Sequence, residues 1–214
     1  NALAAKKGPI HFVMITDLTG PAHAQVGPQG WAAEDYLKWL NEKGGINGHP
    51  ITVEVIDTKY QLPLIRTAYA RNKDRKHVTM SFDAVSGGIE ALKAQFIEDK
   101  IPVLMLTGHG PALYPPGWVF AEIPPYDDIL CGYGDWIKKN WKENRKPRIA
   151  LLLGDYASGR SPEMAKWYIE KIGIDIVSIE YVPTLPTDTS DILIRMRDAK
   201  PDFVFDTLMP DQCK

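Results

Sequence analysis

The run IALLL at residues 149–153 is the stretch that decides the fold of this chain. All of its residues are apolar, so a strand built from them has no polar face and must be covered on both sides. Strands of that kind are typical of parallel sheets that carry helices on both faces. The run therefore indicates an α/β fold.

Short strand-like runs alternate with segments of helical period through the rest of the chain. The runs IHFVMIT at residues 10–16 and ITVEVI at residues 51–56 are the clearest of these strands. Between them, apolar residues recur at helical spacing from Trp31 to Leu40, and the pair Gly44-Gly45 then favours a helix end. Further strands are expected at 78–82, 103–107, 118–123, 174–182 and 203–206, and further helices at 62–71, from 86 onward, and at 129–141, 164–172 and 192–196. This repetition predicts parallel sheets flanked by helices.

Two adjacent prolines, Pro124 and Pro125, interrupt this pattern. Proline cannot continue a central strand, and a pair of prolines fits a crossover between two units. We therefore predict a first α/β lobe over residues 8–122 and a second over residues 123–214. The second lobe has three clear strands and is expected to be partial.

Composition and charge exclude several classes of protein. The formal charge of −2 is too small to favour a nucleic-acid or membrane-surface partner. No apolar run reaches the length of a membrane span. Residues 1–8 are polar and rich in alanine and lysine, as expected of a mature N-terminus from which a signal peptide has been removed. Cys131 and Cys213 lack metal-site spacing and are expected to be separate thiols, with a single disulfide as the alternative.

Motifs of catalysis and cofactor binding are absent from the sequence. It contains no Gly-x-Ser-x-Gly elbow, no Gly-x-Gly-x-x-Gly phosphate loop, no Walker sequence and no His-Glu-x-x-His pair. The five histidines are scattered, and only His109 falls in a candidate binding loop. We therefore predict no catalytic residue, no metal site and no cofactor.

Four loops follow predicted strands at the position where open parallel sheets bind their ligands. Ligands gather beyond the carboxyl ends of such strands, and the helix N-termini there suit a carboxylate. The loops cover residues 16–21, 83–88, 107–111 and 154–159. The last three also have a plain structural interpretation: Ser86 as a helix N-cap, Thr107 to Gly110 as a turn, and Asp155 and Ser158 as caps.

An ordered set of motifs runs through the chain. The motifs are Leu18-Thr19-Gly20-Pro21, NEKGGING at 41–48, Lys100-Ile101-Pro102-Val103, DYASGRS at 155–161, and Thr187-Asp188-Thr189-Ser190 followed by Pro201-Asp202-Phe203-Val204. The set resembles the type I periplasmic solute-binding proteins, and most of all the branched-chain amino-acid-binding branch that serves ABC transporters. This resemblance implies a two-lobed fold.

The resemblance also implies a function. The chain would be the extracytoplasmic solute-binding component of an ABC importer, secreted or lipid-anchored, with the permease subunits as its partners. It would bind an amino acid, branched-chain or similar, or a related amide between two lobes by hinge closure. In the family the first lobe holds the ligand's carboxylate and the second lobe closes over it. Carried over, the ligand-binding residues are Ser86, Gly87, Thr107, Gly108, His109, Gly110, Tyr156, Ser158 and Leu208.

Departures from the family pattern leave the branched-chain specificity open. Val26 stands where family members often place an aromatic residue, and Ser158 aligns with a tyrosine. Two other functions stay open as well. The same fold serves as the ligand-sensing domain of receptors and regulators, whereas an α/β enzyme would need a nucleophile and base that the sequence does not display.

Overall fold

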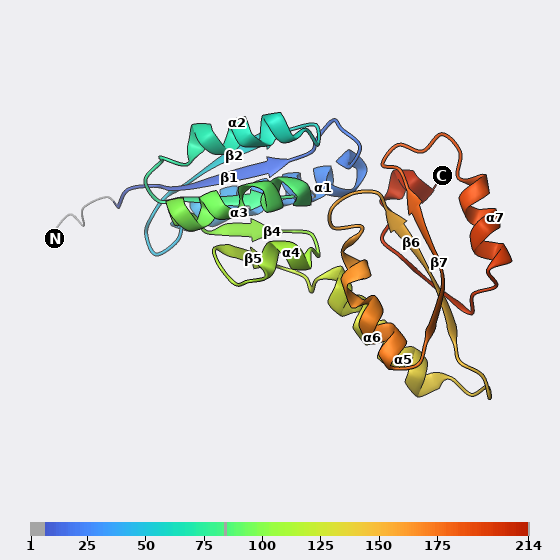
Figure 1. Cartoon of the computed structure of the whole chain (residues 1–214). Helices are drawn as coiled ribbons and strands as arrows, with labels where there is room; N and C mark the ends of the chain where they lie inside the picture. The colour runs from blue at the N-terminus through green and yellow to red at the C-terminus, as the bar shows by residue number, and fades with distance from the viewer. Residues whose placement is uncertain (1–6, 84, 214) are drawn as a thin grey trace. The chain divides into compact units, whose positions relative to one another are not determined.

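The computed structural model describes residues 7–83 and 85–213 (Figure 1). The chain forms two compact units, each described by itself below. The first comprises the residues up to Leu106 together with Pro115–Glu122. The second comprises Thr107–Tyr114 together with the residues from Ile123 onward. The segment Thr107–Tyr114 therefore packs with residues that follow it much later in the sequence.

The first unit is built on a five-stranded sheet in the order β2-β1-β3-β4-β5, and all of its neighbouring strands are parallel. The strands are β1 (Ile10–Thr16), β2 (Ile51–Asp57), β3 (Val78–Phe82), β4 (Val103–Met105) and β5 (Val119–Ala121). All five therefore end at the same edge of the sheet, its carboxyl edge.

Three helices cover the two faces of this sheet (Figure 1). They are α1 (His23–Glu42), α2 (Leu62–Asn72) and α3 (Ser86–Asp99). A side-chain carbon on Gly30 of α1 would lie 3.9 Å from both Met14 and Thr16, so α1 covers the face to which these residues point. Phe96 of α3 packs edge-on against Phe82 at 5.3 Å, on the opposite face. Burial on both faces explains why β1 ends in four fully buried residues.

The second unit contains a three-stranded parallel sheet in the order β7-β6-β8. Its strands are β6 (Arg148–Gly154), β7 (Asp175–Val182) and β8 (Phe203–Asp206), and its helices are α4 (Gly110–Leu113), α5 (Tyr126–Asn140), α6 (Lys166–Lys171) and α7 (Ser190–Asp198), with 3₁₀ turns at Ser161–Ala165 and Pro210–Cys213. The core joins the central strand β6 to Leu130 and Ile137 of α5 and to Ile169 of α6.

The structure confirms the predicted fold class. Every residue from Ile149 to Leu153 is buried, as the apolar run requires of a central strand. The helix predicted over 164–172 is in fact a 3₁₀ turn followed by α6. Cys131 and Cys213 are both free thiols, which confirms that expectation. Within residues 7–83 and 85–213, no helix is both long and apolar enough to cross a bilayer.

Candidate functional site

The turn after β1 is held by two carboxylates. Asp17 is fully buried and accepts hydrogen bonds from the backbone N–H groups of Gly20 at 2.5 Å and Ala22 at 2.7 Å. Asp57, at the end of β2, accepts from the Leu18 N–H at 2.9 Å and the Thr19 hydroxyl at 2.6 Å. Burial opposes ionisation of Asp57, but these hydrogen bonds outweigh it and lower its pKa. Both carboxylates therefore hold the turn through hydrogen bonds, and those made to Asp57 favour its ionised form.

The loop after β3 leads into α3, where Ser86 is the first helical residue and fully buried. Val85 occupies the N-cap position and no side chain makes a capping bond, so the interpretation of Ser86 as the N-cap is wrong. Gly87 is exposed at the same helix start. A side chain on Gly88 would press against Ile65 of α2, which explains the second glycine as a packing requirement. Ser86 and Gly87 thus lie at the N-terminus of a helix, where the helix dipole favours negative charge.

The segment that begins at Thr107 belongs to the second unit. Residues Thr107, Gly108, His109 and Gly110 are all buried. The Gly108 carbonyl accepts from the Tyr126 N–H at 3.3 Å and from the Ser161 hydroxyl at 3.3 Å. A side-chain carbon on Gly108 would lie 2.6 Å from the Tyr126 ring and 2.7 Å from the Pro124 carbonyl oxygen. The backbone there comes closer to its neighbours than any residue with a side chain permits.

Thr207, which the sequence did not single out, organises the loop after β6. Its hydroxyl accepts from the Gly154 N–H at 3.1 Å and donates to the Gly159 carbonyl at 2.8 Å. The Tyr156 hydroxyl donates to the carbonyl of Thr207 itself. Ser158 is buried in the same loop, and its carbonyl accepts from the Ser161 N–H at 3.1 Å. Three hydrogen bonds therefore tie this loop to the end of β8.

Leu208 follows Thr207 and lines an apolar hollow of about 310 Å³ in the second unit. The hollow is bordered by Leu152, Val182, Thr189, Ile192, Leu193, Leu208, Gln212 and Cys213. Its lining is supplied by the sheet, by α7 and by the turn at Pro210–Cys213. Leu208 thus offers an apolar contact beside the polar loop that Thr207 holds.

The structure brings most of the predicted site residues together in the second unit. The loop at Thr107–Gly110 meets the loop at Tyr156–Ser158 through Ser161, and Leu208 joins them through Thr207. Ser86 and Gly87 lie in the first unit, at its carboxyl edge. One signal in the sequence could have revealed Thr207: it is a hydroxyl residue directly after a strand, as Thr107 was expected to be.

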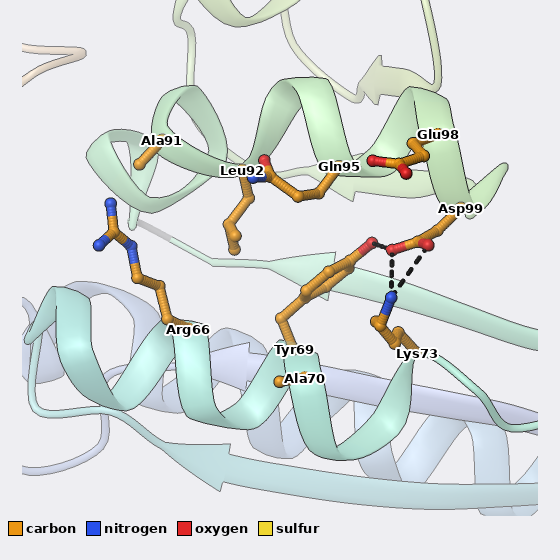
Figure 2. A pocket seen from close by; sticks show the side chains of 9 residues that line it. All are labelled: Arg66, Tyr69, Ala70, Lys73, Ala91, Leu92, Gln95, Glu98 and Asp99. Atoms are coloured by element: carbon orange, nitrogen blue, oxygen red, sulfur yellow. Dashed lines mark hydrogen bonds and ion pairs between the residues drawn. The ribbon is translucent and has the colours of Figure 1, made fainter.

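A separate groove of about 480 Å³ lies between α2 and α3 and contains none of the predicted site residues (Figure 2). At one end the Tyr69 hydroxyl donates to Asp99 at 2.6 Å, and the Lys73 ammonium contacts the same carboxylate at 3.0 Å. Burial and Asp99 raise the pKa of Tyr69, while Tyr69 and Lys73 lower that of Asp99. Arg66 lies toward the other end, beside Ala91 (Figure 2). The polar groups at the Asp99 end satisfy one another, which favours a structural role for them.

No candidate metal site is found in the described part of the chain. Among those residues, no group of three histidine, cysteine or carboxylate side chains is placed to hold a metal ion. What the loops offer instead is a set of hydroxyl groups and backbone amides at the ends of parallel strands. Such groups suit the recognition of a small polar solute.

Comparison with known proteins gives a consistent result. The sequence profile described as "Periplasmic binding protein" matches residues 9–213. No curated protein sequence matches the chain significantly. The solved structures described next are all less than 25% identical in sequence to this chain, so their similarity establishes the fold alone.

Three of those structures differ in the solute that they name. A branched-chain amino acid ABC transporter protein from Thermus thermophilus with bound valine is 24% identical, with a TM-score of 0.82 over 94% of this chain and 52% of that chain. A fatty acid ABC transporter substrate-binding protein from Thermomonospora curvata is 17% identical, with a TM-score of 0.79 over 92% of this chain and 50% of that one. A solute-binding protein from Rhodopseudomonas palustris BisB5 in complex with 3,4-dihydroxybenzoic acid is 22% identical, with a TM-score of 0.76 over 95% and 55%. The chain spans about half the length of these proteins.

Proposed function

The chain belongs to the periplasmic binding protein family, and on that premise we propose that it is the extracytoplasmic solute-binding component of an ABC importer. Its solute is an amino acid or a related amide, which it binds and releases unchanged. The observation that carries the proposal is the meeting of two loops, Thr107–Gly110 and Tyr156–Ser158, through the hydrogen bond from Ser161 to Gly108. Both are loops at which open parallel sheets bind ligands.

In this proposal both units contribute to recognition of the solute, and they act as two lobes of which the second includes Thr107–Tyr114. The start of α3 supplies Ser86 and Gly87, whose N–H groups and hydroxyl attract the solute's carboxylate. The second lobe supplies the loops held by Ser161 and Thr207, and it closes over the solute by hinge motion. The closed form is the one that the permease subunits recognise.

The solutes of similar proteins support the recognition of a carboxylate group. Valine and 3,4-dihydroxybenzoic acid, named for two of the similar structures, both carry a carboxylate, and so does a fatty acid. Their remaining parts differ widely in size and polarity. The carboxylate is therefore the part of the solute that the shared fold is suited to hold, and the other loops decide what else fits.

Calorimetry on this protein tests the proposal. The panel holds valine, leucine, an aliphatic amide, a fatty acid and 3,4-dihydroxybenzoic acid. We expect saturable binding of an amino acid or amide. Ser86→Ala is expected to weaken it about tenfold, because one hydrogen bond to a charged group is lost. Ser190→Ala, at an exposed position on α7, is the control and should bind like the parent protein.

The alternative outcomes discriminate clearly. Binding of the fatty acid or the dihydroxybenzoate alone would contradict the amino-acid assignment while leaving a solute-binding role. Equal affinity of the Ser86→Ala and Ser190→Ala proteins would contradict the role of Ser86. Absence of binding across the whole panel would contradict the proposed function.

A further inference from the structure

Three polar side chains lie together under α1 in the first unit. Thr16 and Asp83 are fully buried and Ser81 is 3% exposed. In the register of the sheet Ile15 pairs with Phe82, and these two point to the α3 face. Thr16 and Ser81 are next to them along the strands and therefore point to the α1 face. Asp83 follows β3 directly and its N–H donates to the Ile15 carbonyl at 3.0 Å, so the same alternation places its side chain on that face. These three residues form the α1-face cluster.

The oxygens of this cluster have no well-formed hydrogen bond, although the Ser81 hydroxyl lies close enough to Asp83 to favour its charged form. Within the described part of the chain, the Thr16 and Ser81 hydroxyls and both carboxylate oxygens of Asp83 make no well-formed hydrogen bond. The two other carboxylates that hold the same edge, Asp17 and Asp57, accept several hydrogen bonds each. An ionised carboxylate that is buried without partners is costly, whereas a neutral acid has a proton to share with nearby hydroxyls. The surroundings of Asp83 thus favour its protonated form.

The charges around Asp83 act in the same direction. Burial raises the pKa of Asp83 to about 7; the Ser81 hydroxyl opposes this rise, and the negative charge of Glu122 beyond β5 adds to it. From α1, the buried residues that face the sheet include the uncharged Gly27 and Gly30. Asp17, which follows β1, and Asp57, at the end of β2, already accept hydrogen bonds from the turn after β1.

We infer that the α1-face cluster is a proton-binding site that makes the stability of the first unit depend on pH. The reaction is the uptake of one proton by the Asp83 carboxylate, which gives a neutral carboxylic acid beside the two hydroxyls. When Asp83 loses that proton, its charge requires solvation that the underside of α1 does not supply. Asp83 lies three positions before Ser86, so this requirement arises close in the sequence to the proposed ligand-binding residue.

The direction of the pH dependence follows from the two states of the chain. In the unfolded chain Asp83 titrates near its ordinary value of 3.8, and in the folded chain near 7. Between these values the folded state holds one proton more, so the folding equilibrium constant falls as pH rises. Ionisation of Asp83 lowers the folding equilibrium constant by about a thousandfold in total. This fall is complete above pH ~8 and absent below pH ~3.8.

The test compares the parent protein with Asp83→Asn by denaturant unfolding between pH 5 and pH 8.5. Asparagine has the shape of the neutral acid but cannot ionise. The histidines are common to both proteins, so the difference between the two unfolding curves isolates Asp83. We expect Asp83→Asn to be the more stable protein at pH 8.5, and we expect its advantage to shrink steadily toward pH 5. An advantage that does not change with pH, or a variant less stable at pH 8.5, would overturn the inference.

Asp57→Asn is the matched control at the same edge of the sheet. Its carboxylate is ionised and bonded in the folded state, so its loss should lower stability by the same factor across this pH range. If Asp83→Asn does not fold, infrared spectroscopy of the parent protein tests directly whether Asp83 is protonated. The band of a protonated carboxyl group should be present at pH 5.5 and absent at pH 8.5; its absence at pH 5.5 would overturn the inference.

The coupling between protonation of Asp83 and solute binding at Ser86 rests on the proposed function, and it is measured separately. In the parent protein, solute affinity should fall between pH 6 and pH 8, and this fall should be smaller in Asp83→Asn. A solute affinity with the same pH dependence in both proteins would overturn the coupling. Failure of all solutes to bind would count against the proposed function instead, because the stability measurement needs no solute.

Discussion

Gly45→Ala is expected to destabilise the first unit by about 4 kcal/mol, because strain and a backbone clash add at this position. Gly45 has φ of +73°, in the left-handed region, and a side-chain carbon there would overlap the carbonyl oxygen of His49. That carbonyl accepts the Ile46 N–H at 3.0 Å and the His49 N–H bonds back to Ile46 at 2.9 Å, so it cannot move aside freely. Denaturant unfolding measures the effect.

Gly48→Ala separates the two causes. Gly48 has φ of +78°, close to that of Gly45, but a side-chain carbon there would meet nothing within 4 Å. Gly48→Ala should lower the free energy of unfolding by about 1 kcal/mol, which is the cost of the backbone conformation alone. Equal destabilisation by the two substitutions would show that the contact with His49 contributes nothing. The pair also gives a physical reason for the run GGING at 44–48, which the sequence presents only as a motif.

Thr207→Val is expected to destabilise the second unit by about 3 kcal/mol, because it leaves two backbone groups without their partner. Valine keeps the shape of threonine, so packing is retained while the bonds to the Gly154 N–H and the Gly159 carbonyl are lost. The loop should open more often, and amide hydrogen exchange at Gly154 and its neighbours should accelerate together with the loss of stability.

Thr187→Val provides the matched control for this substitution. Thr187 is exposed, and its change to valine should alter stability by less than about 0.5 kcal/mol. A Thr207→Val protein as stable as the control, with unchanged hydrogen exchange, would show that Thr207 does not hold the loop. If solute binding also weakens in Thr207→Val alone, the result links the loop to the proposed function.

The positions of the strands and helices were largely predictable from the chain. The apolar run at 149–153 and the alternation around it follow from burial, which each segment requires wherever it packs. The start of α3 at Ser86 was predicted correctly, but its N-cap was not, because capping depends on backbone angles at Val85. The short helix α4 was also missed, since four residues are too few to carry a period.

The candidate site was predictable in its loops but not in its connections. The sequence indicated the loops at 107–110 and 154–159 because each follows a strand. It could not indicate that Ser161 joins them, or that Thr207 holds the second loop, because these bonds cross 53 and 48 residues. Asp83 illustrates the same limit, since in the sequence it is an ordinary acidic residue at a strand end.

The sequence by itself determined that this chain forms parallel sheets flanked by helices, because an apolar run or a helical period records local burial. The resemblance of its motifs, borne out by the family match, indicated the family. Only the tertiary structure decided which buried carboxylates accept backbone hydrogen bonds, as Asp17 does, and which have no well-formed hydrogen bond, as is the case for Asp83. A hydrogen bond or a raised pKa depends on what distant segments bring within a few ångströms, and spacing along the chain does not record those distances.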